Sequence, residues 1–87
     1  MILTVEVKID GEFQKIEHAK GLVDEVAISF DEKGLELLLE KISSLKGKKD
    51  HLHLMTPSWA GDELTEEGQE GEKYTLVNHL RIVNLEG

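Results

Sequence analysis

A stripe of aliphatic residues between Asp31 and Lys46 constrains the fold of this chain more than any other sequence feature. The stripe recurs at helical spacing and comprises Leu35, Leu38, Leu39, Ile42 and Leu45. Apolar side chains at this period form one face of an amphipathic helix. Asp31 is a residue type typical of an N-cap, and Gly47 stands where helices commonly end. The pattern therefore predicts a helix from Asp31 to about Lys46, with Leu38 and Leu39 fully buried.

The remaining segments are patterned for strands, which would give the helix a surface to pack on. Apolar and polar residues alternate, more or less strictly, in the segments 3–9, 13–17, 26–30, 51–55 and 74–85. Asp10-Gly11 supplies a hairpin turn between the first two segments. We expect an α+β fold in the order β-β-β-α-β-β, with a mostly antiparallel sheet of four or five strands and one helix packed on one face.

The alternation slips within the segment 74–85. Leu80 and Ile82 agree in parity with Leu76. The opposite parity is found at Val77, Val83 and Leu85. Because side chains alternate between the faces of a strand, such a slip requires an explanation. Either both faces are partly covered, or a bulge shifts the register.

Length and composition limit the possible classes of protein. A chain of 87 residues has room for a single domain, which we assign to residues 1–87. It contains no cysteine, which excludes disulfides and thiolate chemistry. Its first residues are typical of neither a signal peptide nor a membrane anchor, so we expect a cytoplasmic protein. A net charge of −8 argues against nucleic acid or an anionic membrane as partner and favours a basic protein.

The connection from Pro57 to Lys73 is unusually long and acidic. It carries six acidic residues against one lysine, and so accounts for most of the net charge. No packing requirement explains it, and connections of this length are commonly functional or disordered. One interpretation is a solvated loop that keeps the protein soluble. The other is a surface that steers a basic partner, for which the candidate residues are Trp59, Asp62, Glu63, Glu66 and Glu67.

Trp59 and the carboxylates allow more than one interpretation. Trp59 belongs to a residue type enriched in interface hot spots, but a lone tryptophan beside Pro57 and Gly61 could equally close one end of the core. The carboxylates are expected to be open to water and dispensable for the fold, since exposed charges contribute little to stability.

The histidines are the only candidates for site chemistry. His51 and His53 lie two residues apart in a strand and therefore project from one face, and His79 could join them from the last strand. Three imidazoles with an open position would suit a zinc hydrolase. Strand histidines also serve simply as polar residues on the less buried face, and His18 has no evident partner. Since no residues that would orient the imidazoles are identifiable, we expect no metal, no cofactor and no catalytic residue.

Three segments of the sequence resemble one protein family. They are ISFDEKGLELLLEKI, HLHLMTPSWAGDEL and TLVNHLRI, and together they are similar to immunity protein family 32 over roughly Ala27–Val83. Members of this family are small α+β proteins that protect bacteria from their own polymorphic toxins. The resemblance implies binding and inhibition, and it transfers no catalytic constellation.

We therefore interpret the chain as a cytoplasmic immunity protein that binds and neutralises a cognate, basic protein toxin without catalysis. One alternative is a general protein-interaction or homo-oligomerisation domain, such as a homodimer formed through an exposed strand edge. The other is a small metal-dependent hydrolase built on His51, His53 and His79.

Overall fold

The helix α1 (Glu32–Ser43) lies within the segment that the aliphatic stripe predicts. Asp31 is its N-cap, and the carboxylate accepts a hydrogen bond of 2.8 Å from the backbone N–H of Gly34. The helix ends at Ser43 with Ser44 as its C-cap, earlier than the predicted end near Lys46, and Gly47, with a φ of 78°, belongs to the turn that follows. This computed structural model describes residues 1–9 and 23–87. The turn, strand and histidine expected between residues 10 and 18 lie outside the described residues.

The described strands form two antiparallel sheets. The first is three-stranded in the order β2 (Glu25–Phe30), β1 (Leu3–Lys8) and β4 (Thr75–Leu76). The second pairs β3 (His51–Met55) with β5 (His79–Val83). The predicted α+β class, the antiparallel pairing and the single helix of the described chain are confirmed. The strands are divided between two sheets instead of being gathered in one.

The segment 74–85 changes from one sheet to the other. Its first part, β4, pairs with β1, and its second part, β5, pairs with β3. Between them, the Val77 N–H donates to the Val5 carbonyl at 2.8 Å, and the Asn78 carbonyl accepts from the Thr56 N–H at 3.0 Å. The slip in alternation seen in the sequence marks this change of sheet.

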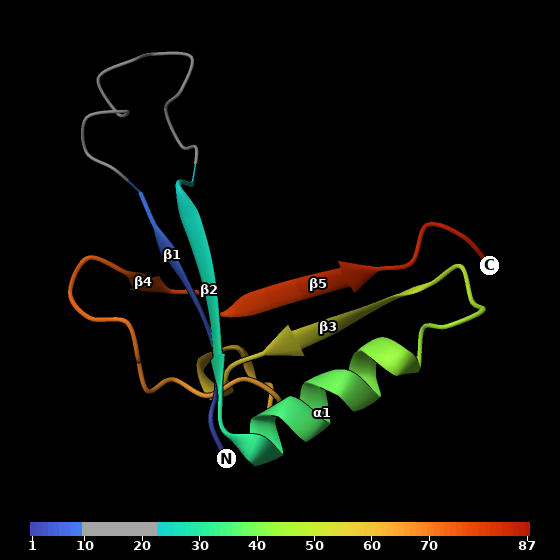
Figure 1. The fold of residues 1–87 in the computed structure, drawn as a ribbon, viewed down its shortest axis with the longest axis horizontal. Coiled ribbons are helices and arrows are strands. Elements are labelled where there is room, and N and C mark those ends of the chain that lie inside the picture. The colour runs from blue at the N-terminus through green and yellow to red at the C-terminus, as the bar shows by residue number, and fades with distance from the viewer. Residues whose placement is uncertain (10–22) are drawn as a thin grey trace, which may run out of the picture.

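The core lies where the two sheets and the helix meet. In Figure 1, β1 and β2 run across the direction of β3 and β5, while α1 runs beside β3. The buried residues of the core cluster come from β1, α1, β3 and the acidic connection; they are Leu3, Val5, Leu38, Leu54 and Leu64.

The inward face of α1 differs from the prediction. Leu38 is buried as expected, but Leu39 is 54% exposed and Ile42 is 45% exposed, so the expectation that Leu39 is buried is wrong. Gly34 explains the difference: a Cβ there would lie 1.8 Å from the Ile2 carbonyl oxygen. Because the helix approaches Ile2 closely at Gly34, the side of the helix that carries Gly34 and Leu38 faces the core. Leu39 and Ile42, on the neighbouring side, remain exposed.

Candidate functional site

The site is built on the turn that follows β3. The chain passes from β3 through the buried Thr56 into a short 3-10 helix, Pro57–Trp59. The Thr56 carbonyl accepts hydrogen bonds of 2.9 Å from the N–H groups of both Trp59 and Gly61, and its hydroxyl donates to the Asn78 side chain at 2.8 Å. These bonds anchor the turn to Asn78, the residue before β5, and fix the backbone from which Trp59 projects.

Gly61 and Ala60 complete the turn through unusual backbone geometry. Ala60 has a φ of 63°, in the left-handed region that favours glycine. A Cβ on Gly61 would lie only 2.3 Å from the Met55 carbonyl oxygen. The Thr-Pro-Ser-Trp-Ala-Gly segment therefore specifies one tight reversal of the chain.

Trp59 begins a row of rings along β3 and β5. Its ring centroid lies 5.9 Å from that of His79, which lies 4.8 Å from His53, which in turn lies 5.0 Å from His51. Trp59 is 53% exposed, whereas Leu64 is buried in the core. Leu64, and not Trp59, closes this end of the core, so Trp59 presents a fixed and half-open aromatic surface.

The histidines predicted on facing strands do meet. Nδ1 of His53 lies 2.6 Å from Nε2 of His79, so one ring must donate a proton that the other accepts. Desolvation, followed by the charges of His79, His51 and Arg81, lowers the pKa of His53. Within residues 1–9 and 23–87, no group of three or more histidine, cysteine or acidic side chains is arranged to hold a metal ion.

Two of the four candidate carboxylates hold the turn together. Glu66 accepts a 2.7 Å hydrogen bond from the Ser58 N–H, and bonds from the Ser58 hydroxyl and N–H lower the pKa of Glu66. Glu63 accepts from the Met55 N–H at 3.2 Å and from the Asp62 N–H at 3.0 Å. These two side chains, expected to be dispensable for the fold, therefore each bind backbone amides of the turn.

The other two carboxylates, Asp62 and Glu67, are exposed. A hydrogen bond shared between the carboxyl groups of Asp62 and Glu63 raises the pKa of Asp62 and lowers that of Glu63. The five candidate residues thus lie on one turn and the chain that follows it, but they differ in character. Glu63 and Glu66 shape the surface, while Trp59, Asp62 and Glu67 are displayed on it.

The rest of the acidic connection packs against β1, contrary to the expectation that no packing requires it. Two hydrogen bonds join Thr65 to Leu3. The Thr65 N–H donates to the Leu3 carbonyl at 2.7 Å, and the Leu3 N–H donates to the Thr65 hydroxyl oxygen at 3.0 Å. Glu6, only 2% exposed, accepts hydrogen bonds from the N–H groups of Gln69 at 2.8 Å and Glu70 at 3.4 Å. In the sequence, the feature that indicates this packing is Leu64, a single leucine within an otherwise polar and acidic segment.

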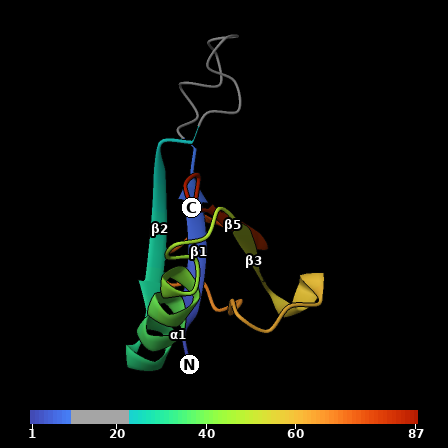
Figure 2. The same cartoon turned by 90° about the vertical axis from the view of Figure 1, so that its right-hand side faces the viewer.

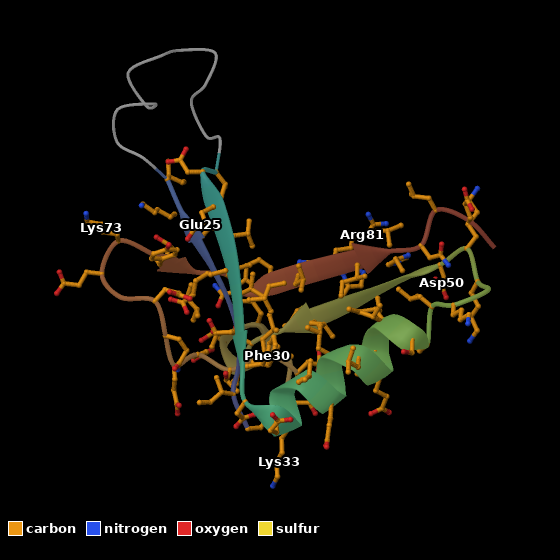
Figure 3. All side chains as sticks on the ribbon, in the orientation of Figure 1. Glu25, Phe30, Lys33, Asp50, Lys73 and Arg81 are labelled. Atoms are coloured by element: carbon orange, nitrogen blue, oxygen red, sulfur yellow. The ribbon has the colours of Figure 1, made fainter. Side chains whose placement is uncertain are left out.

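The basic side chains near this surface come from outside the segment 59–67, and the charge of Lys41 on α1 partly offsets the rise in the pKa of Asp62. Figure 3 shows Lys73 at the far end of the connection and Arg81 on β5, on opposite sides of β2. The segment around Trp59 and Asp62 to Glu67 itself contains no lysine or arginine, so its formal charge is negative.

Comparison with known proteins identifies the family. Residues 25–80 match the family model described as Immunity protein 32. The match covers more than half of the chain and includes β2, α1, β3, the Trp59 turn and the acidic connection, so the chain belongs to the immunity protein 32 family. No curated protein and no solved structure matches the chain. Among the residues described, no helix is both long and apolar enough to cross a membrane.

Proposed function

We propose that this chain is a cytoplasmic immunity protein that binds a cognate protein toxin and neutralises it without catalysis. Membership of the immunity protein 32 family carries this proposal. The partner is a protein toxin with a basic surface, because a chain of net charge −8 attracts cations and repels nucleic acid.

The toxin-binding surface consists of Trp59, Asp62, Glu63, Glu66 and Glu67. Trp59 suits an anchor because it is half exposed yet held by the Thr56 turn and the His79 ring. A side chain that is already ordered loses little conformational entropy on binding. The carboxylates add a negative field that speeds encounter with a basic partner.

Within this surface the acids have two roles. Glu63 and Glu66 are positioning residues, since their carboxylates bind the backbone of the turn that presents Trp59. Asp62 and Glu67 are exposed and supply the charge that a basic toxin meets. The two groups should therefore give different kinetic signatures when they are neutralised.

This proposal can be tested by measuring binding kinetics with the purified toxin domain, obtained from the toxin gene next to the gene for this chain. The double variant Asp62→Asn, Glu67→Gln should slow association several-fold at low salt. The difference should shrink as salt rises, because the Debye length falls from about 10 Å at 0.1 M to about 3 Å at 1 M. Trp59→Ala should mainly speed dissociation, as expected for an anchor.

A matched control carries the same change in charge on the helix. Glu36 and Glu40 are exposed on α1, a different element from the Pro57–Trp59 turn, and α1 and the turn lie apart in Figure 2. The variant Glu36→Gln, Glu40→Gln should slow association less than the double variant at Asp62 and Glu67. Equal rates for both variants would contradict the assigned surface. Failure of the wild-type chain to bind the toxin, or to protect cells that express it, would contradict the function itself.

A further inference from the structure

The strand β2 lies at the edge of its sheet. Within the described chain, β1 pairs with β2 on one side and with β4 on the other, and no strand pairs with the outer side of β2. In the β1–β2 register, Leu3 lies opposite Phe30 and Val5 lies opposite Ile28. The direction of the backbone groups of β1 decides which groups of β2 face the open edge.

Leu3 and Val5 make their described backbone hydrogen bonds on the side away from β2. The Leu3 N–H donates to the Thr65 hydroxyl at 3.0 Å, and the Leu3 carbonyl accepts from the Thr65 N–H at 2.7 Å. The Val5 carbonyl accepts from the Val77 N–H at 2.8 Å. These backbone groups are therefore not directed at β2.

It follows that the residues of β2 opposite them direct their own backbone groups outward. In an antiparallel ladder, hydrogen-bonded pairs alternate with pairs that are not hydrogen-bonded. Phe30 and Ile28 belong to the second kind, and by the period of two so does Val26. The N–H and C=O groups of all three residues thus point to the open edge of the sheet.

The same three residues also expose large apolar side chains. Val26 is 57% exposed, Ile28 43% and Phe30 47%. Phe30 lies at the end of β2 where the strand leads into α1 (Figure 3). All three lie on one strand at a period of two, so their side chains share one face of the sheet. Single exposed apolar residues are common, but a group of this size usually marks an interaction site.

The edge of β2 also lacks the usual protection. Natural edge strands carry lysine, proline, bulges or inward charges that prevent pairing with another strand. Between Val26 and Phe30 this strand contains no charged residue and no proline, and its pairing with β1 is continuous from Glu25 to Phe30. Among residues 1–9 and 23–87, nothing pairs with this edge, which leaves it available to a further strand.

We propose that two copies of this chain associate through β2, edge to edge and antiparallel, and so join their three-stranded sheets into one. The sequence of β2 is self-complementary in this arrangement. With Ile28 opposite Ile28 of the second copy, Val26 of each copy lies opposite Phe30 of the other. All three residues then exchange backbone hydrogen bonds, and their side chains lie on one face. This contact is isologous, as in most homodimers.

The lack of charge at the centre of β2 favours a second copy over a basic toxin as the occupant. A basic toxin is attracted to acids, and the acidic candidate surface lies on the opposite side of the molecule from β2 (Figure 2). The outward-directed residues of β2, Val26, Ile28 and Phe30, offer backbone groups and apolar side chains, which an identical strand matches. The proposal does not rest on toxin binding, and the dimer leaves both Trp59 surfaces open.

The two kinds of association should depend on salt in opposite ways. Two copies of net charge −8 repel each other, and the Ile28-centred register brings Glu25 of one copy near Asp31 of the other. Since salt screens repulsion between exposed charges, the dimer should tighten as salt rises. The attraction between the acidic immunity protein and a basic toxin should instead weaken as salt rises.

Cross-linking tests the register directly. The chain has no cysteine, so a single introduced thiol reports on itself. A hydrogen-bonded antiparallel pair has a Cα–Cα distance of about 5.5 Å, within the range of about 4.4–6.8 Å that a disulfide spans. Under mild oxidation, Ile28→Cys should form a covalent dimer rapidly, while Val26→Cys and the similarly exposed Val83→Cys should not. Equal cross-linking of all three variants would overturn the proposed register.

Mass measurement over a concentration series tests the association itself. Sedimentation equilibrium of the wild-type chain in 0.5 M salt should approach twice the monomer mass of 9.8 kDa. Ile28→Lys should remain monomeric and folded by circular dichroism, and the matched control Val83→Lys should still dimerise. A wild-type chain that stays monomeric, together with slow cross-linking of Ile28→Cys, would overturn the proposal. If the wild-type chain is monomeric and the Ile28→Lys variant no longer binds the toxin, the edge of β2 binds the toxin and not a second copy.

Discussion

The two sheets of this molecule use the same alternating pattern in different ways. In the β3–β5 sheet, Leu54 faces the core while His53 lies on the exposed face, as expected for a sheet with one side in water. In the other sheet, β1 is buried on both faces: Leu3 and Val5 belong to the core, and the polar Thr4 and Glu6 are also buried.

The neighbouring strand β2 shows the opposite outcome. Val26 and Ile28 lie opposite Val7 and Val5 of β1, yet both are exposed. Alternation therefore indicates which side chains share a face, while burial depends on what covers that face. The acidic connection covers the polar face of β1 through Glu6, and nothing in the described chain covers the apolar face of β2 to the same extent.

The largest expected effect contrasts the two strands of one sheet. Leu3→Ala should lower the free energy of unfolding by about 2–5 kcal/mol, because it removes a fully buried side chain and leaves a cavity. Ile28→Ala should cost less than about 1 kcal/mol in the monomer, because Ile28 is already 43% exposed. Urea denaturation at low protein concentration measures both values. Equal losses would mean that β2 is covered in solution as β1 is.

A smaller effect tests the covered polar face of β1. Glu6→Ala removes the charged acceptor for the Gln69 and Glu70 N–H groups, and a hydrogen bond to a charged group contributes about 1.5–3 kcal/mol. Glu67→Ala, at an exposed acid of the same connection, should change stability by less than about 0.5 kcal/mol. Hydrogen exchange of the Gln69 and Glu70 amides should speed up in the first variant only. Unchanged exchange there would show that Glu6 does not anchor the connection.

The elements that local patterns specify were predictable from the sequence. The N-cap at Asp31, the helical spacing and the strand 51–55 depend on neighbours in the chain, and each agrees with the structure. The outward position of Leu39 was not predictable in this way, because it depends on Gly34 meeting the Ile2 carbonyl. The division into two sheets depends likewise on where the segment 74–85 finds partners, which alternation alone does not indicate.

The candidate site shows the same limit. The sequence located the Trp59 turn and the acids, and it allowed for a meeting of His53 and His79, which the structure brings to 2.6 Å. It did not distinguish Glu63 and Glu66 from Asp62 and Glu67, since all four appear as acids in one loop. Their difference arises from tertiary folding, which brings the N–H groups of Met55 and Ser58 to two of the carboxylates.

The smallest expected effect concerns the open face of the β3–β5 sheet and its response to pH. The pKa of His53 lies below its ordinary value of 6.5 because of desolvation and the neighbouring charges. The unfolded chain therefore takes up a proton at a higher pH than the folded chain does. By linkage, protonation of His53 favours the unfolded chain. The free energy of unfolding is therefore highest, as far as His53 is concerned, above about pH 6.5, and it decreases as the pH falls toward the pKa of His53 in the folded chain.

Urea midpoints measured between pH 7.5 and 5.5 should consequently fall slightly as the solution is acidified. This window lies above the titration of Glu63 and Glu66, whose pKa values are lowered, so their loss of charge does not contribute. His53→Gln removes the titrating group and should flatten the dependence. His51→Gln, which leaves the contact between His53 and His79 in place, should largely preserve it. An equally steep fall in the wild type and in His53→Gln would show that the histidine pair has no part in the pH response, and the exposed face of this sheet would then be energetically passive, unlike the covered face of β1.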